Sequence, residues 1–150
     1  MINIDINSEF SRVFAPEILE RAAAAALSQQ SAPDADLTLV LTGDAQIQAL
    51  DRDFMGKDAP TDVLSFPAAE EDPETGRQYL GDIIISVPRA EAQCLAGGHS
   101  LEDELSLLVV HGVLHLLGHD HADPQEKARM WAAQSAVLTR LNISPSIVHE

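Results

Sequence analysis

The sequence predicts a small α+β fold, a mixed β-sheet packed with helices, and three observations lead to it. Segments patterned like strands alternate along the chain with segments that carry helix start and stop signals. The chain has 150 residues, 45% of them hydrophobic, which suits one domain with one core. Leu80 to Val87 is the most apolar strand-like segment, so we expect it near the centre of the sheet.

The first half of the chain alternates between the two kinds of element. Residues 2–6 alternate apolar and polar side chains, as a half-buried strand does. A helix is predicted over residues 16–29, with its proline near the first turn, and a second strand over residues 37–41. Asp44 is expected to cap a further helix that continues to about Phe54.

A strand, a loop and two helices are predicted next. Residues 63–66 read as a short strand that Pro67 should stop, and the acidic residues 68–79 read as a loop. Pro88 opens a helix that a pair of glycines closes at Gly97.

The last third of the chain predicts two more helices. A capping-box-like pair at Ser100 and Asp103 starts a helix that runs to about Leu117. This helix is apolar on nearly every side, so we expect it to be buried. The final helix starts near Pro124 and runs to about Leu141.

Composition limits the function classes. The formal net charge of −15 argues against a nucleic-acid partner when taken alone, although a local basic rim remains compatible with it. Cys94 is the only cysteine, which excludes an internal disulfide and suits a reducing compartment. We see no secretory signal and no apolar run of the roughly 18 residues that a membrane helix needs. The sequence therefore predicts a cytoplasmic protein without a membrane partner.

The segment HGVLHLLGHDH, residues 111–121, carries the main chemical signal. His111, His115 and His121 repeat the spacing H-x3-H-x5-H, which is the ligand spacing of zinc proteases that read HExxHxxGxxH. His111 and His115 share one face of a helix. On a straight helix His119 would lie about 12 Å from His111, too far for one ion.

The chain must therefore turn back after His115, and Gly118 can end the helix because glycine adopts the left-handed conformation at little cost. His121 then completes the site and His119 points elsewhere. Three neutral nitrogen donors favour one zinc ion per chain with water in the fourth position. A closed structural site remains an alternative, with a fourth ligand from the set Cys94, Asp120 and Asp123. We interpret His99 and His149 as ordinary solvated or hydrogen-bonded side chains.

Gly112 stands where such a protease carries its glutamate base. Without that proton acceptor, peptide hydrolysis is disfavoured. Zinc-bound water has a pKa near 7, so hydroxide forms without a strong base. Ester or phosphodiester hydrolysis remains open, and for a phosphodiester we expect cationic groups nearby.

Three segments together resemble a known family: HGVLHLLGHDH, GKDAPTDVLSFP at residues 56–67, and LGDIIIS at residues 80–86. They are similar to the YbeY family of bacterial single-strand-specific endoribonucleases. The resemblance implies a zincin-like fold and zinc held by His111, His115 and His121. It also implies work in the cytoplasm on the three-prime end of small-subunit ribosomal RNA and in ribosome quality control. Implied partners are single-stranded or ribosomal RNA, the small ribosomal subunit and its assembly GTPase.

We predict from this resemblance that residues 1–150 form a single metal-dependent endoribonuclease domain, in which zinc hydroxide attacks a phosphodiester. Lys57 is the candidate for binding phosphate. Asp58 and Asp82 are the other catalytic candidates, either for positioning or for hydrogen bonds that orient the histidines; a turn contact and a strand-start cap are the plainer interpretations. Met55 departs from the family, whose members carry an arginine just before the Gly-Lys-Asp triplet.

Two alternative functions remain open from the sequence. One is a metalloprotease-like hydrolase with the same ligand spacing, which Gly112 disfavours. The other is a non-catalytic ribosome-assembly factor whose zinc is structural. Turnover of RNA separates the second alternative from an enzyme.

Overall fold

In the computed structural model, residues 1–56 and 61–147 are described. Their strands form one four-stranded mixed sheet in the order β1-β2-β4-β3. The strands are β1 (Ile2–Ile6), β2 (Asp36–Thr42), β3 (Val63–Glu71) and β4 (Gln78–Ser86). β1 and β2 pair in parallel, as do β2 and β4, whereas β3 pairs antiparallel to β4. The predicted apolar strand is thus a central one, as expected.

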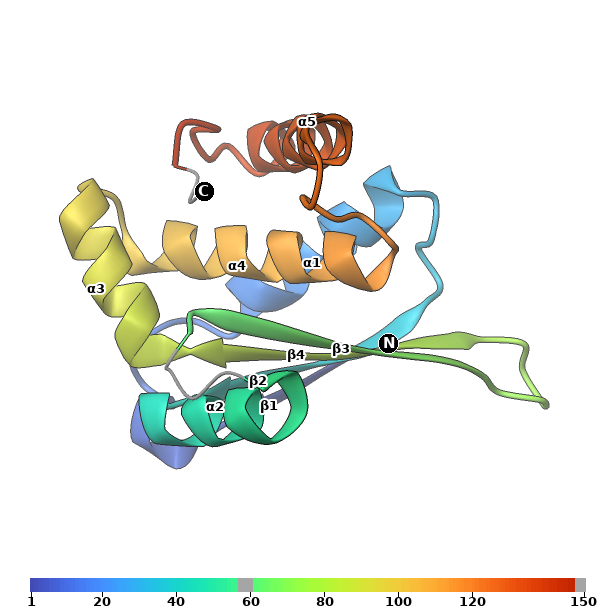
Figure 1. The fold of residues 1–150 in the computed structure, drawn as a ribbon, viewed down its shortest axis with the longest axis horizontal. Helices are drawn as coiled ribbons and strands as arrows, with labels where there is room; N and C mark the ends of the chain where they lie inside the picture. Colours follow the sequence, from blue (N-terminus) through green and yellow to red (C-terminus); the bar gives the residue numbers. More distant parts are fainter. Residues whose placement is uncertain (57–60, 148–150) are drawn as a thin grey trace.

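Five α-helices occur among the described residues, and most of them cover the two faces of the sheet. They are α1 (Glu17–Gln29), α2 (Asp44–Leu50), α3 (Val87–Gly97), α4 (Leu101–Leu116) and α5 (Pro124–Arg140). Figure 1 shows α1 and α4 on one face of the sheet, α5 packed above α4, and α2 on the opposite face. The α+β fold class is therefore confirmed.

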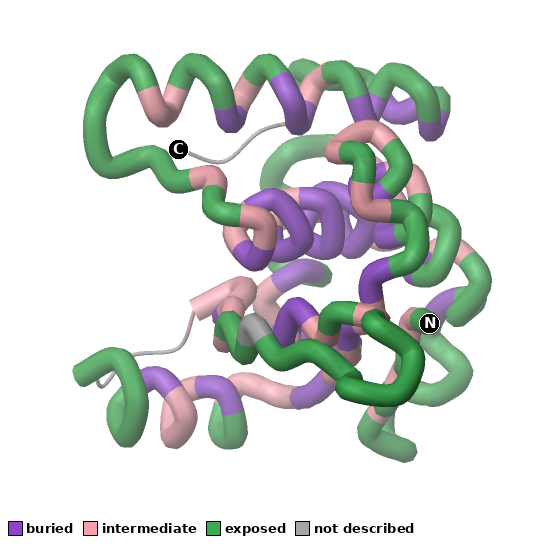
Figure 2. Tube along the Cα trace, turned by 90° about the vertical axis from the view of Figure 1, so that its right-hand side faces the viewer, coloured by how far each residue is buried: buried purple, intermediate pink, exposed green. Residues whose placement is uncertain are grey.

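Helix α4 lies at the centre of the protein. Eleven of its residues are buried, including the run from Glu104 to Val110, so the prediction that this helix is buried is confirmed. Ser100 caps it by accepting a hydrogen bond from the backbone N–H of Asp103. In Figure 2 the buried residues concentrate in this central layer, between α5 and the sheet. Because α4 is packed on several sides, the side chains that it carries are held in fixed positions.

The segment from residue 63 to residue 79 differs from the prediction. β3 continues through Pro67 to Glu71, and β4 starts at Gln78, so the expected loop is mostly a hairpin. Pro67 is tolerated because β3 is an edge strand, where a missing N–H breaks no ladder bond. The register shifts after Pro67. Gly81, its partner on β4, has φ 138° and lies so close to the Phe66 carbonyl that a Cβ would collide with it.

The helix predicted from Asp44 also differs in detail. Gly43 occupies the N-cap position, and the Asp44 carboxylate accepts a hydrogen bond from the Ser86 hydroxyl instead of capping the helix. Residues 51–55 continue α2 as a π-helix, which Gly56 ends in the left-handed conformation with φ 76°. The other predicted helices agree with the structure to within about two residues. No helix in the described part of the chain combines the length and hydrophobicity needed to cross a bilayer.

Candidate metal centre

Three histidines converge at the C-terminal end of α4. His111 and His115 lie on one face of that helix, and His121 follows the turn that ends it. One ring nitrogen from each lies within 4.8 Å of the other two. Gly118 makes the turn with φ 98°, as the sequence predicted. The structure therefore brings together the three predicted ligands.

His119 points away from this cluster, also as predicted. Its Nε2 lies 2.9 Å from Oε1 of Gln30, just beyond the end of α1. Asp120 and Asp123 have local roles: Asp120 accepts from the backbone N–H of His121, and Asp123 caps α5 by accepting from the N–H of Glu126. Among the described residues, the cluster thus has three His, Cys, Asp or Glu ligands and no fourth.

The remaining histidines and Cys94 lie outside the cluster. His99 hydrogen-bonds through Nε2 to Oε1 of the buried Glu104 at 2.5 Å, so its interpretation as a hydrogen-bonded side chain fits. Cys94 is buried, and burial raises the pKa of its thiol, which disfavours the thiolate that a metal needs. His149 lies outside the described residues.

Gln134 of α5 orients His111, the first of the three predicted ligands. Its Oε1 lies 3.0 Å from Nδ1 of His111, and the side chain is buried. This hydrogen bond fixes the Nδ1–H tautomer of His111, so its Nε2 is the nitrogen available to a metal. That Nε2 lies 3.1 Å from Nε2 of His115. Two nitrogens bound to one tetrahedral zinc lie about 3.4 Å apart, given Zn–N bonds of about 2.0–2.1 Å. The pair is therefore close to the spacing that the ion requires.

The environment of His115 keeps its ring neutral. Burial first, and then the charges that His111 and His121 would carry, lower the pKa of His115 to about 4. A neutral imidazole has the lone pair that a metal binds, so at neutral pH His115 needs no deprotonation before binding.

Gly112 lies between the two ligands of α4 and packs against the sheet. A Cβ at this position would come within 2.7 Å of Cγ2 of Ile83. The side-chain hydroxyl of Ser65 also approaches the Gly112 carbonyl, at 3.5 Å. The glycine thus lets α4 lie close to β4, and the same contact excludes a glutamate here. The sequence suggested a chemical reason for this glycine, and the structure adds a steric one.

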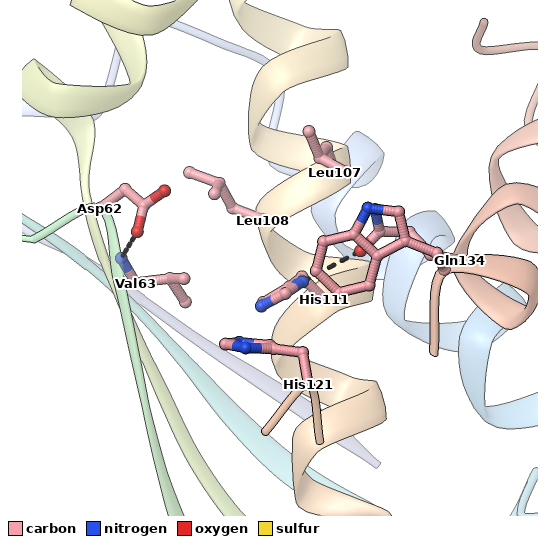
Figure 3. Close-up of a pocket in the computed structure, with 8 residues that line it drawn as sticks. Asp62, Val63, Leu107, Leu108, His111, His121 and Gln134 are labelled. Carbon is pink, nitrogen blue, oxygen red and sulfur yellow. Dashed lines mark hydrogen bonds between the residues drawn. The ribbon is translucent and has the colours of Figure 1, made fainter. Parts of the chain in front are cut away.

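Two adjoining hollows open beside the histidines, and both are lined by Asp62, Val63, His111 and His121. The first has a volume of about 170 Å³ and extends between α4 and α5. The second, of about 380 Å³, follows β3 and reaches His115. In Figure 3, Asp62 and Val63 form the wall opposite His111 and Gln134. The three nitrogens are therefore accessible from open space on the β3 side.

Trp131 completes the wall of the first hollow. Its ring makes edge contacts with His111 and His121, with centroids 5.9 and 5.6 Å away. The Nζ of Lys127 lies 5.5 Å from the centroid of this ring. The indole N–H is buried and has no hydrogen-bond partner among the described residues. Such an orphan donor costs about 1–3 kcal/mol unless water or a ligand accepts from it.

The three predicted catalytic residues are not placed beside the histidines by the described part of the structure. Lys57 and Asp58 lie outside the described residues. Asp82 projects from the face of β4 opposite to α4, where its carboxylate accepts a hydrogen bond from the Tyr79 hydroxyl. Side chains alternate between the two faces of a strand, and Ile83 next to it is the residue that meets α4. The expectation that Asp82 orients the histidines is therefore corrected; Gln134 does this for His111.

Sequence reasoning missed Asp62, Trp131 and Gln134. Gln134 could have been found from the sequence, because it is a polar residue at a position of α5 where the helical pattern predicts burial. Trp131 is the only tryptophan in the chain and follows the buried Met130. Asp62 belongs to the quoted GKDAPTDVLSFP segment, but only the fold shows that it faces the histidines.

The fold and this cluster define a class: a small α+β protein with a three-histidine site that can hold a metal ion beside an open pocket. The family model described as Endoribonuclease YbeY matches residues 3–142. The chain belongs to this family of endoribonucleases, so a nuclease that hydrolyses RNA is the activity its membership supports.

Curated relatives agree over nearly the whole length. Endoribonuclease YbeY of Geobacillus kaustophilus is 42% identical over 153 residues, covering 95% of this chain and 98% of the relative. The protein of the same name from Roseiflexus castenholzii is 41% identical and covers 96% and 94%. A solution structure from Thermotoga maritima superposes with a TM-score of 0.60 at 26% identity, covering 95% of this chain and 92% of that one. The fold described above is thus similar to that of a solved protein.

Proposed function

We propose that residues 1–150 act as one zinc-dependent endoribonuclease domain of the zincin type, with one zinc ion on His111, His115 and His121. The observation that carries this proposal is the convergence of three imidazole nitrogens within 4.8 Å beside an open pocket. We further propose that it works in the cytoplasm on single-stranded ribosomal RNA, in three-prime maturation of the small-subunit RNA and in ribosome quality control. The small ribosomal subunit and its assembly GTPase are proposed as partners.

The donor set supports zinc as the ion. Three neutral imidazoles without a fourth protein ligand are typical of catalytic zinc sites, which keep one position for water or substrate. The His111–Gln134 hydrogen bond is the kind of outer contact that orients such ligands. When bound, zinc would supply a Lewis acid and lower the pKa of water to about 7.

The chain's own residues have separate tasks in this proposal. Gln134 orients His111, and burial keeps His115 neutral. Gly112 brings no carboxylate to the site, so no side chain at that position can shuttle a proton. Lys57 is proposed to bind the phosphate, and Asp58 is proposed for positioning or for a hydrogen bond that orients a histidine. The two hollows have no lysine or arginine among their described lining residues, so this charge has to come from a neighbouring segment.

The deciding experiment combines metal analysis with RNA cleavage. We expect native mass spectrometry of the purified protein to give one zinc per chain, and the loaded protein to cleave single-stranded RNA. His115→Ala should lose both properties. His119→Ala is the matched control, because this histidine lies in the same turn but contacts Gln30, and it should keep both.

Other outcomes separate the alternatives. Zinc bound at one per chain without any RNA cleavage would favour a structural ion in an assembly factor. Release of peptides from unfolded casein that depends on His111 would favour a protease. Metal bound through His119 instead of His121 would overturn the ligand set.

Lys57 provides a test of the phosphate-binding part of the proposal. Loss of one charge-assisted contact costs roughly 1.5–3 kcal/mol, which corresponds to a tenfold to hundredfold loss of cleavage efficiency. Lys57→Ala should therefore keep its zinc and cleave RNA more slowly by that factor. Met55→Arg should raise RNA affinity or activity, most at low salt where screening is weak. Unchanged RNA cleavage rates in both variants would contradict the proposal that Lys57 binds the phosphate.

A further inference from the structure

We propose that the hollow between α4 and α5 binds one unpaired nucleobase of the RNA, and that Asp62 selects bases with an amino group on their Watson–Crick edge. This inference rests on the proposed function, because it takes the histidine cluster as the place of cleavage. The hollow shares His111 and His121 with that cluster, so a base bound in it would belong to a nucleotide next to the cleaved phosphodiester.

The size and walls of the hollow fit an aromatic ring. Its volume is about 170 Å³, and a cavity of about 150 Å³ is known to accept a benzene ring. Leu107 and Leu108 of α4 and Val63 of β3 supply aliphatic walls, and Trp131 supplies an aromatic one. All four bases can stack on or pack against such side chains, because each base has an aromatic face. The walls therefore provide affinity for any aromatic base, and selectivity among the four bases has to come from the polar groups.

The charge of the hollow favours a base over a phosphate. Asp62 brings a carboxylate to one wall, and the described lining residues include no lysine or arginine. A phosphate inside this hollow would be repelled by the carboxylate at short range, whereas at the histidines the proposed zinc ion would offset that charge. A neutral ring that presents N–H groups would instead donate hydrogen bonds to it.

Asp62 is held in place and retains acceptor capacity. Its Oδ1 accepts from the backbone N–H of Val63 at 2.8 Å and from the Thr61 hydroxyl at 3.5 Å, and its Oδ2 accepts from Nε2 of Gln93 at 3.3 Å. A carboxylate has about four lone-pair sites, so about one remains, and the rotatable Thr61 hydroxyl can release a second. Guanine presents a ring N–H and an amino group side by side, which can use both sites. Adenine and cytosine present one amino group. Uracil presents only a ring N–H between two carbonyl oxygens, which the carboxylate repels.

This arrangement gives selectivity for single strands a physical cause. In a duplex the Watson–Crick edge of each base is occupied by its partner, so it cannot meet Asp62. Only an unpaired base, splayed out of the strand, can enter the hollow. Base selection and single-strand selection would then come from the same contact.

Trp131 makes the proposal measurable without cleavage, because it is the only tryptophan in the chain. Its fluorescence should change saturably when guanosine, adenosine, cytidine and uridine 5′-monophosphates are titrated into metal-free protein. The guanine nucleotide should bind roughly 5- to 150-fold more tightly than the uracil nucleotide, the range expected for one bidentate contact. Equal affinities for the four nucleotides in the parent protein would overturn the proposal.

Asp62→Asn tests the role of the carboxylate, because the amide replaces one acceptor oxygen by a donor. The preference for guanine over uracil should shrink or reverse in this variant, with the far-ultraviolet circular dichroism unchanged. Asp5→Asn is the matched control: it makes the same charge change on an exposed residue of β1 and should leave the preference unchanged. A preference unaltered in well-folded Asp62→Asn would also overturn the proposal.

Cleavage then places the base relative to the phosphodiester. Zinc-loaded protein is given short single-stranded RNAs that differ at one position, including one with an abasic nucleotide, beside His115→Ala as a blank. We expect the RNA with guanine to be cleaved fastest and the abasic RNA slowest. If zinc-loaded protein cleaves no RNA, the proposed function fails; if it cleaves all these RNAs equally, only the base pocket fails.

Discussion

The two faces of strand β4 carry neighbouring isoleucines into different surroundings. Ile83 faces α4 and touches Gly112, between the two histidines of that helix. Ile84 faces the opposite way and packs with Ile47 of α2 and Leu64 of β3. Both side chains are buried, but only one of these faces supports the metal centre. Position on the sheet, rather than hydrophobicity or nearness in sequence, therefore decides whether a core residue affects the site.

The largest effect is expected from filling the space at Gly112. Gly112→Glu would place a Cβ 2.7 Å from Ile83 and bury a carboxylate between α4 and β4. Overpacking alone costs about 1–3 kcal/mol, and the buried charge adds to it. We expect urea unfolding to show a loss of more than about 3 kcal/mol and no gain of peptidase activity.

A second substitution checks the cause of that loss. Ile83→Ala removes the side chain that Gly112 meets, so the double variant should lose less stability than the sum of the two single losses. Equal stability of Gly112→Glu and the parent would mean that α4 and β4 can separate without cost, and the steric account of the glycine would be wrong.

The sharpest form of the comparison uses the two isoleucines. Ile83→Ala and Ile84→Ala should each lower the free energy of unfolding by about 2–5 kcal/mol, because both leave a cavity in the core. Only Ile83→Ala should also weaken zinc binding, since it removes the surface against which the ligand-bearing helix packs. Denaturant titration and zinc titration measure the two quantities separately. Equal zinc affinities in the two variants would mean that the two faces of β4 do not differ in their effect on zinc binding.

The third prediction concerns pH. The pKa of His115 falls from 6.5 to about 4 in the folded protein, chiefly through burial. Between these values the unfolded chain binds more protons than the folded one, so stability should rise with pH across that window and fall on acidification. Urea midpoints of the metal-free protein at pH 7 and pH 5 measure this change. His115→Gln should show a smaller difference, and an equal difference would assign it to other groups.

The smallest effect is expected on the α2 side. Asp82→Ala should cost about 1 kcal/mol through loss of the Tyr79 hydrogen bond, and should leave zinc binding and cleavage nearly unchanged. The pKa of Tyr79 is raised first by burial and second by this hydrogen bond, so the substitution should lower it toward its usual value. Tyr79 is the only tyrosine, which makes an ultraviolet absorbance titration specific. A large loss of cleavage activity in Asp82→Ala would mean that Asp82 contributes to catalysis after all.

The convergence of the three histidines could be predicted because its geometry is local. Helical spacing places His111 beside His115, and the limit on Zn–N distance together with Gly118 selects His121 over His119. The central position of β4 and the burial of α4 also follow from composition within single segments. These features need no knowledge of how distant segments pack.

The features that sequence reasoning missed depend on distant packing. Gln134 meets His111 only because α5 folds back over α4, and Asp62 faces the cluster only because β3 pairs with β4. Asp82 lies on the face of β4 opposite to α4, and this placement depends on a register that cannot be read from the sequence. Pro67 did not end its strand because β3 turned out to be an edge strand.

The three predicted ligands differ in burial, and this difference has a kinetic consequence for metal binding. His111 and His115 are half-buried on α4, whereas His121 is exposed in the turn between α4 and α5. In the proposed metal site, release of an ion would need its ligands to detach in sequence, and the exposed ligand in the turn would detach at the lowest cost. The rate at which the ion leaves, and through that rate its affinity, should therefore depend on the turn after Gly118. Exchange of one metal for another can then proceed by way of His121 while the core stays folded.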